Sequence, residues 1–442
     1  MHRFFSGLLV VSSLCSSSTD PEMLKWCEVV DSMVAESPSD SKAVSVSTID
    51  SRETLEAIRE MKPRYVAFVV RPDELNANVV RRLKRIICSV DSDPFEDAVW
   101  GIVTGPTPED AKRVATSFEP RNISSVLATT GLGKDVVSGP VTVLSDANPP
   151  GEWWAKDSSG KVEKHTTAGD TSHVFAEAWK TLDPEFLLTS SHASERNLEM
   201  PFSRGNIVAY KGKFGAVKNL KMIDYSTGQA VESKVDGAKV DMLAAPKREK
   251  VWLAAGNCLI ANHKKGDDMI MSALGFGKVN QFVGYIKTTW YGEIGWNTWR
   301  YFGSYGYSLV DSWYAANQLL IKKLLVDKTE KSQRDMAGLS WDFDGTIFYG
   351  NPRRKIKLLQ SERLEASKDG DLPLLIVFPE TKKDRKLLSA PQGFEVFVAD
   401  DFALVMKWPK LTEDWIEKLN FSGSASRGSS SRKDTVEISL HR

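Results

Sequence analysis

The sequence predicts an α/β fold made of two side-by-side, mostly parallel sheet subdomains with helices on both faces. In the first third of the chain, short apolar strand patterns alternate with amphipathic helix patterns, as in parallel sheets joined by helical crossovers. Two later stretches, at residues 185–192 and 250–260, contain short apolar runs that are typical of buried parallel strands. A chain of 442 residues with 41% hydrophobic and 26% charged residues has room for two or three domains.

The alternating pattern predicts four strand and helix pairs in the first subdomain. The expected strands lie at residues 8–12, 43–47, 65–70 and 99–103, and the expected helices at residues 21–35, 52–61, 76–90 and 109–117.

Beyond this region the sequence Asn148-Pro149-Pro150-Gly151 indicates a boundary, because paired prolines and glycine end regular elements. The sequence then predicts a hairpin at residues 153–163, a helix and a strand at residues 171–192, and exposed hairpins at residues 207–239. It further predicts two strands with a helix between them at residues 250–286, a helix at residues 308–325 and short strands at residues 372–408. The predicted domains are an N-terminal α/β subdomain (1–148), a second α/β subdomain (149–362), a small β-rich module (363–420) and a disordered tail (421–442).

Composition excludes several classes of function. The 58 basic and 58 acidic residues balance, which gives no electrostatic reason to expect nucleic acid as a partner. No apolar run reaches the roughly 18 residues of a membrane span, and four cysteines do not make a disulfide framework in a chain of this length. The segment Gly131-Leu132-Gly133-Lys134 lacks the spacing of a phosphate loop, and the sequence has no tight ligand pair such as C-x-x-C or H-x-x-x-H, so no cofactor and no metal are expected.

The amino terminus allows two interpretations. Met1-His2-Arg3 and the following apolar residues resemble a secretory signal peptide. The same residues also fit a strand that leads into the helix at residues 21–35, because Thr19-Asp20-Pro21-Glu22 has the composition of a helix start. The strand interpretation favours a cytoplasmic location over a secreted one, and the location stays open.

A histidine and a cysteine follow the two buried strands of the second subdomain. His192 ends the predicted strand at residues 185–192, and Cys258 lies near the end of the stretch at residues 250–260. Because the carboxyl ends of parallel strands meet at one edge of a sheet, we expect these side chains to lie near each other. Small residues surround both, which leaves room for a substrate backbone. A thiol with a neighbouring imidazole as its base is a nucleophile for acyl transfer.

This arrangement resembles the caspase and gingipain clan of cysteine peptidases, in which a strand-end His precedes a strand-end Cys. The resemblance covers roughly residues 5–360 and is closest to the gingipain branch. It includes Phe348-Tyr349-Gly350-Asn351-Pro352, which is similar to a Tyr-Gly-Asp-Pro element of gingipain-like chains, with Asn351 in place of Asp.

The resemblance implies a cysteine endopeptidase whose partner is a protein or peptide substrate. It assigns Cys258 as the nucleophile and His192 as the general base and acid, with the backbone N–H groups of Ala193 and Cys258 as oxyanion donors. Ala193 stands where the caspase pattern has Gly. The expected substrate pocket consists of Ser191, Gly256, Asn257, Thr288, Thr289, Trp290 and Tyr291. No acidic residue occurs in 288–291, so the preferred substrate residue stays open.

Three alternatives remain at this point. Asp342 and Asp344 match the aspartate motif of haloacid-dehalogenase-type phosphatases, with Asp400-Asp401 as a metal-binding pair, although residues 334–340 are not an apolar strand. A zinc site could combine Cys258 with histidines, namely His192, His263 and either His165 or His173. The chain could also be an inactive, peptidase-like module that binds a peptide or whose cleft is covered by residues 207–239.

Overall fold

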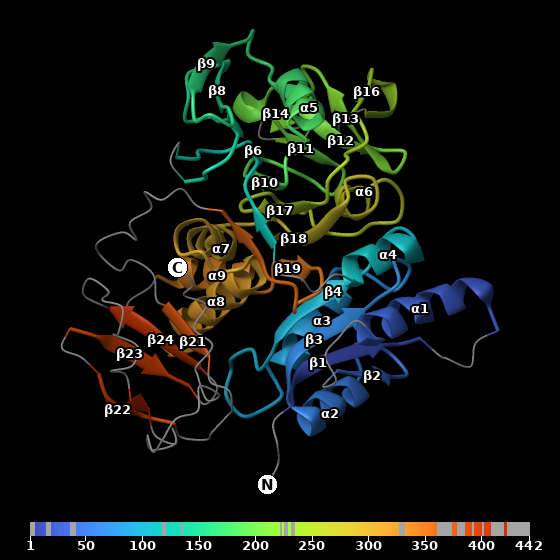
Figure 1. Ribbon diagram of the computed structural model, residues 1–442, viewed down its shortest axis with the longest axis vertical. Helices are drawn as coiled ribbons and strands as arrows, with labels where there is room; N and C mark the ends of the chain where they lie inside the picture. The colour runs from blue at the N-terminus through green and yellow to red at the C-terminus, as the bar shows by residue number, and fades with distance from the viewer. Residues whose placement is uncertain are drawn as a thin grey trace.

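In the computed structural model, helices cover one large sheet, and a small β-rich region lies near the carboxyl end of the chain (Figure 1). The structure describes residues 5–14, 19–35, 41–116, 121–133, 136–221, 223–224, 229–230, 235–326, 332–359, 374–377, 385–390, 393–399, 402–407 and 420–421.

The described residues form a twelve-stranded central sheet in the order β2-β1-β3-β4-β19-β18-β17-β10-β6-β7-β8-β9. In chain order its strands are β1 (Phe5–Ser12), β2 (Lys42–Ser45), β3 (Pro63–Val69), β4 (Val99–Val103), β6 (Val126–Ala128), β7 (Val141–Leu144), β8 (Glu152–Lys156), β9 (Val162–Thr166), β10 (Phe186–Thr189), β17 (Lys250–Ala254), β18 (Val279–Tyr285) and β19 (Thr346–Tyr349). The predicted mixed α/β architecture with a mostly parallel sheet is confirmed, and residues 5–12 are a sheet strand.

Strand β19 joins the two expected sheet subdomains into one continuous sheet. This strand pairs in parallel with β4 and antiparallel with β18. Strand direction therefore reverses between β19 and β18, so the carboxyl ends of the two halves lie at opposite edges of one sheet. Strands β6 and β7 belong to the second half beside β10, so the expected boundary at residue 148 does not separate the halves.

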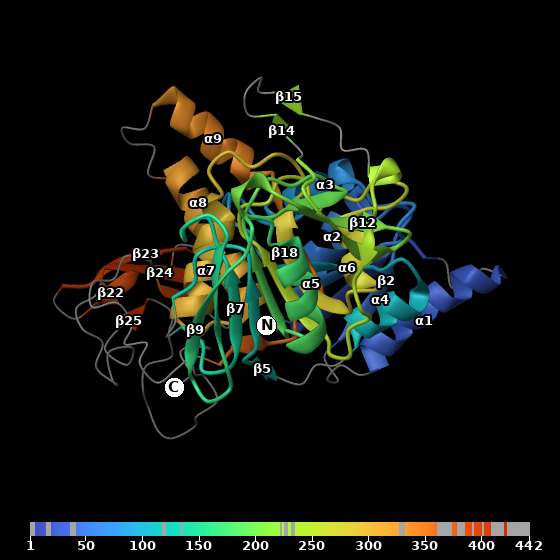
Figure 2. The same cartoon turned by 90° about the horizontal axis from the view of Figure 1, so that it is seen from above.

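Helices cover both faces of the sheet. They are α1 (Pro21–Ala35), α2 (Arg52–Met61), α3 (Ala77–Ile87), α4 (Pro108–Ala115), α5 (Ser172–Thr181), α6 (Met269–Leu274), α7 (Glu293–Ser304), α8 (Leu309–Ile321) and α9 (Gln333–Phe343). From β1 the chain passes through α1 to β2 on one side, and from β2 it passes through α2 to β3 on the other side of β1. Because such crossovers are right-handed, α1 and α2 lie on opposite faces of the sheet. Helix α1 packs on α4, and α2 packs on α3. Seen from above, α7 and α8 lie on the side of the sheet away from α1 and α4 (Figure 2).

Two smaller β-regions attach to this core. The expected hairpins after His192 form a four-stranded sheet of β11 (Asn197–Glu199), β12 (Asn206–Tyr210), β13 (Lys213–Val217) and β16 (Asp241–Met242), with the pair β14 (Ile223–Asp224) and β15 (Gln229–Ala230). Near the carboxyl end lie β21 (Leu374–Val377), β23 (Glu395–Val398) and β24 (Phe402–Lys407), with β22 (Leu387–Ser389) paired to β25 (Asn420–Phe421). The predicted disordered tail lies outside the described residues, apart from Phe421.

Two helices were not predicted. Helix α7 lies in a segment for which no element was predicted, and α9 includes Asp342 of the aspartate motif. Gly295 lies inside α7, where glycine disfavours helix, but a Cβ there would come within 2.0 Å of the Ala255 carbonyl oxygen. The close packing of α7 on the end of β17 therefore requires a residue that lowers helix propensity. None of the helices in the described part of the chain has the length and apolar character of a membrane span.

We predict that the junction between β4 and β19 tolerates no side chain at Gly101. A Cβ at this position would lie 2.6 Å from the Gly350 carbonyl oxygen and 2.7 Å from the Phe348 ring. Gly101→Ala should therefore lower the free energy of unfolding by about 1–3 kcal/mol, through overpacking of the two strands. Chemical denaturation measures this change. Gly237→Ala is the matched control, because no atom lies within 4 Å of its added Cβ; equal stability of the two variants would contradict the prediction.

Candidate active site

Three adjacent strands of the second half of the sheet end at the same edge and carry the predicted site residues. Strand β10 pairs in parallel with β17, with Thr189 opposite Ala254, and β17 pairs in parallel with β18. His192 follows β10, Cys258 follows β17, and the loop containing Thr289 follows β18. The strand register therefore brings these three segments together, as the sequence analysis expected for His192 and Cys258.

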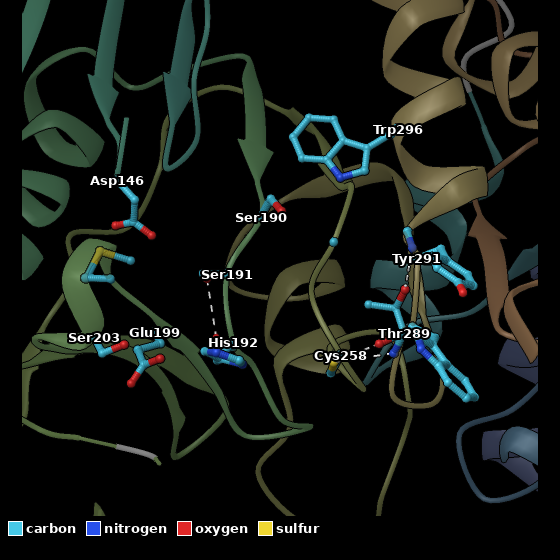
Figure 3. A pocket seen from close by; sticks show the side chains of 14 residues that line it. Asp146, Ser190, Ser191, His192, Glu199, Ser203, Cys258, Thr289, Tyr291 and Trp296 are labelled. Carbon is cyan, nitrogen blue, oxygen red and sulfur yellow. Dashed lines mark hydrogen bonds between the residues drawn. The ribbon is translucent and has the colours of Figure 1, made fainter. Parts of the chain in front are cut away.

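These segments surround an open cavity of about 330 Å³. Figure 3 shows His192 and Cys258 on neighbouring loops of this cavity, with Thr289 and Tyr291 beside the cysteine. The lining residues are Asp146, Ser190, Ser191, His192, Glu199, Met200, Ser203, Gly256, Cys258, Thr289, Trp290, Tyr291, Gly292 and Trp296. Of the residues expected at the site, Ala193, Asn257 and Thr288 do not line it.

The thiol of Cys258 is half-buried and contacts the loop after β18. The backbone N–H of Thr289 donates a hydrogen bond to Cys258 Sγ at 3.4 Å, and the thiol faces the Thr289 carbonyl oxygen at 4.0 Å. Burial raises the pKa of the Cys258 thiol above its ordinary value, while the Thr289 N–H acts in the opposite direction. The thiol is therefore neutral near pH 7, so it needs a base that removes its proton before it can attack a carbonyl. His192 is exposed in the same cavity and is of the right chemical type.

Asn257 does not line the substrate pocket as expected, because its side chain points under the loops. It is fully buried and accepts a hydrogen bond from Thr189 Oγ1 at 2.6 Å. Its amide nitrogen donates to the carbonyl oxygen of Ser191 at 2.9 Å and to Ser191 Oγ at 3.1 Å. Trp252 Nε1 completes the chain by donating to Thr189 Oγ1 at 2.8 Å. The residue before Cys258 thus holds the residue before His192.

Glu195 makes a second connection between the two loops. Its carboxylate accepts from Asn262 Nδ2 at 3.1 Å and pairs with Lys264 Nζ at 2.8 Å, and its carbonyl oxygen accepts from Met269 N. Burial raises the pKa of the Glu195 carboxyl, but the contacts with Lys264 and Asn262 outweigh it and lower the pKa overall. The segment after His192 is therefore tied to the segment after Cys258 by Glu195 as well as by Asn257.

The backbone around the two residues leaves little freedom for substitution. A Cβ at Gly256 would lie 2.4 Å from Ser190 Oγ, so a side chain there would require the Ser190 hydroxyl to move. Ala193 forms an antiparallel bridge with Leu198, in which the His192 carbonyl accepts from Glu199 N and Ser194 N donates to the Asn197 carbonyl. In a bridge of this type the N–H of Ala193 points away from the Leu198 strand.

Sequence reasoning missed the acidic and aromatic residues that other segments bring to the cavity. Asp146 follows β7, which lies two strands from β10 in the sheet, and Glu199 ends β11. Trp296 comes from α7. The position of Asp146 just after an apolar strand was a usable signal, because that strand end meets the same sheet edge. Nothing local to Glu199 or Trp296 indicates the cavity.

The phosphatase interpretation of the aspartate motif was wrong. That chemistry needs an aspartate directly after a strand, whereas Asp342 lies in the last turn of α9 and Asp344 caps this helix. The Asp342 carboxylate is buried and accepts from Thr289 Oγ1 at 3.0 Å, Tyr285 OH at 3.2 Å and Ile294 N at 3.2 Å. Asp400 and Asp401 lie outside the described residues.

The zinc interpretation was also wrong, because its ligands are held apart by other partners. His263 Nδ1 lies 2.6 Å from Asp268 Oδ2, and the ring of His165 stacks on Trp153. His173 lies 3.4 Å from the hydroxyl of Thr167. Within the described residues no group of three or more His, Cys, Asp or Glu side chains is arranged to hold a metal ion.

The chain was compared with protein families, curated proteins and solved structures. No protein-family model matches the sequence, and no curated protein matches it. Among solved structures, one chain described as "Structure of Protease" is similar over 92% of this chain and 92% of its own, with 9% sequence identity and a TM-score of 0.42. A likeness at this level carries no inference about function.

We predict that Asn257 stabilises the fold through its buried hydrogen bonds. Asn257→Ala should lower the free energy of unfolding by about 1–3 kcal/mol, because the carbonyl of Ser191 and the hydroxyl of Thr189 lose a buried partner. Chemical denaturation gives the value. The control is Asn122→Ala, which removes an exposed asparagine and should change stability by about 0.5 kcal/mol or less. An Asn257 variant as stable as the Asn122 variant would refute the role assigned to this network.

Proposed function

We propose that the protein is a cysteine endopeptidase in which Cys258 is the nucleophile and His192 is the general base and acid. One observation supports this above all. Two parallel neighbouring strands, β10 and β17, end at one cavity that His192 and Cys258 both line. An imidazole and a thiol on adjacent strand ends, in a cavity open to solvent, are the groups that acyl transfer to sulfur requires.

The chemistry follows from the groups present. His192 takes the proton from Cys258, and the sulfur attacks the carbonyl carbon of the substrate, which forms a C–S bond and a negatively charged oxygen. The backbone N–H of Cys258, which lines the cavity, stabilises that oxygen. The C–N bond then breaks as His192 returns the proton to the leaving amine. Water, deprotonated by His192, attacks the thioester, which releases the acid and restores the thiol.

The resemblance to gingipain-like peptidases implies the same assignment. The order of His before Cys, each after a buried strand, is the pattern that the sequence shares with that family. Ala193 in place of glycine keeps the backbone N–H that the oxyanion role needs. The module formed near the carboxyl end has no part in this proposal.

An inactive, peptide-binding module is the second candidate. The observation that favours it is the state of the thiol, because burial raises the pKa of Cys258 and so disfavours the reactive thiolate. A binding module would retain affinity for peptides without cleaving them. The two candidates therefore differ in hydrolysis and not in binding.

The charges around the cavity indicate a substrate side chain with positive charge. Asp146 and Glu199 supply carboxylates, and Trp290, Tyr291 and Trp296 supply aromatic rings. The lining residues in the described part of the chain include no lysine or arginine. Carboxylates attract a cation, and aromatic faces bind ammonium and guanidinium groups, so a lysine or arginine side chain fits this lining best.

We predict that Cys258 and His192 are both required for peptide hydrolysis. The purified protein is treated with a panel of peptidyl acyloxymethyl ketones and the labelled residue is located by mass spectrometry, while fluorogenic peptides report hydrolysis. Cys258 should carry the label, and Cys258→Ala or His192→Ala should reduce kcat/KM by at least about 1000-fold, since each removes a group of the reaction.

Cys88→Ala is the matched control, because it removes a half-buried cysteine of the first subdomain and should leave hydrolysis within about twofold. Labelling of Cys27 or Cys88 in preference to Cys258, or no labelling at all, contradicts the mechanism. Tight peptide binding without cleavage supports the binding module instead.

We predict that peptides with lysine or arginine before the cleaved bond are hydrolysed faster than the same peptides with aspartate or glutamate. Asp146→Asn should reduce the preference for the basic residue by about threefold to tenfold, because Asp146 is exposed and its attraction is partly screened by solvent. Values of kcat/KM for matched peptides measure the effect. A preference for acidic residues, or one unchanged in the variant, would exclude this account of specificity.

A further inference from the structure

The loop after β18 is held from behind by helix α9. Trp341 Nε1 donates to the Thr288 carbonyl oxygen at 2.6 Å, and the Tyr291 hydroxyl donates to Asp335 Oδ1 at 2.8 Å. The ring of Tyr291 lies so close to Gly338 that a Cβ there would come within 2.0 Å of it. The helix thus forms the support on which the cavity loop lies.

Asp342 makes the innermost of these contacts. One carboxylate oxygen accepts from Thr289 Oγ1 at 3.0 Å, and the other accepts from Tyr285 OH and from Ile294 N at the start of α7. Thr289 Oγ1 in turn accepts from Gly292 N at 3.0 Å. The carboxylate therefore connects the end of β18, the loop and the first turn of α7.

The same threonine meets the nucleophile through its backbone. The N–H of Thr289 donates to Cys258 Sγ, so the side chain of this residue is bound to Asp342 while its backbone contacts the sulfur. A displacement of Thr289 would remove the donor from the thiol.

We infer that Asp342 is a positioning residue for Cys258, which acts through Thr289 by fixing the backbone N–H that contacts the sulfur. This inference rests on the proposed role of Cys258 as the nucleophile. In this role Asp342, the first aspartate of the phosphatase-like motif, supports the Cys258 thiol and makes no direct contact with the substrate.

The direction in which Asp342→Asn changes the reactivity of Cys258 distinguishes positioning from simple electrostatics. The negative charge of Asp342 disfavours the Cys258 thiolate and acts with burial to raise the pKa of the thiol. If charge were its whole role, Asp342→Asn would make the thiolate easier to form and the sulfur more reactive. Positioning requires the opposite result, because the variant weakens the acceptor that holds Thr289.

The experiment measures alkylation of Cys258 by iodoacetamide in the native, full-length protein, with each cysteine followed by mass spectrometry between about pH 6 and pH 10. Asp342→Asn and Thr289→Val should each slow alkylation of Cys258 about tenfold, the size expected for one hydrogen bond to a charged group. Thr289→Ser keeps the hydroxyl and should react like the unchanged protein. The double variant should be no slower than the slower single variant, because both changes break the same link.

Cys27 and Cys88 serve as internal references, since their alkylation rates report any general loosening of the fold. The matched control is Asp311→Asn, which removes another buried carboxylate, bound by Ser308 and Lys355, and should leave the Cys258 rate within about twofold. Should Asp342→Asn fail to fold, the contrast between Thr289→Val and Thr289→Ser still decides the role of the link. Faster or unchanged alkylation in Asp342→Asn, or multiplied effects in the double variant, would overturn the inference.

Peptide hydrolysis is measured on the same variants. If the unchanged protein cleaves no peptide but the alkylation pattern holds, the endopeptidase proposal fails and the positioning role of Asp342 stands. If peptides are cleaved but the Asp342 and Thr289 variants alkylate normally, the proposal on function stands and the positioning role fails.

Discussion

The parallel pairing of β10 with β17 is the constraint on which the candidate site depends. With Thr189 opposite Ala254, the two chains leave the sheet at the same level, and the small residues that follow allow them to stay close. A shift of one residue would turn every side chain of β17 to the other face of the sheet, and because both faces are buried, each side chain would then meet the wrong packing neighbours. The position of Cys258 relative to His192 is therefore set by the core and not by the loops themselves.

Side-chain hydrogen bonds then hold the loops in the positions that this strand register gives them. Asn257 and Glu195 each connect the segment after β10 with the segment after β17. Both bridges end on backbone groups or on buried partners, where an unsatisfied polar atom is costly. This explains how short, irregular segments keep one conformation at the rim of an open cavity, where a site for acyl transfer needs its groups already in place.

The sequence alone predicts the parts of the fold that local pattern controls. Helices α1 and α2 and strand β4 begin and end where the pattern places them, because the apolar period and the flanking turn residues lie in or next to the elements themselves. The joining of the two halves into one sheet could not be predicted, since β19 is a four-residue strand whose partners β4 and β18 lie far from it in the sequence. For the site, the strand ends indicate His192 and Cys258, but the direction of the Asn257 side chain depends on Thr189 and Ser191, which belong to another strand and its loop.

Helices α7 and α9 show most clearly why some features could not be predicted from the local sequence. The first N–H groups of α7 lack a local cap: Gly292 has no side chain, and the N–H of Ile294 is satisfied by Asp342, almost fifty residues later in the chain. A motif that begins with Asp342 suggests phosphate chemistry when only its neighbours in the sequence are considered. In three dimensions its carboxylate is enclosed by three donors from β18, the cavity loop and α7, which leaves it no position from which to attack a substrate. Donors that are distant in sequence thus decide the role of this carboxylate, and no pattern in residues 341–346 carries that information.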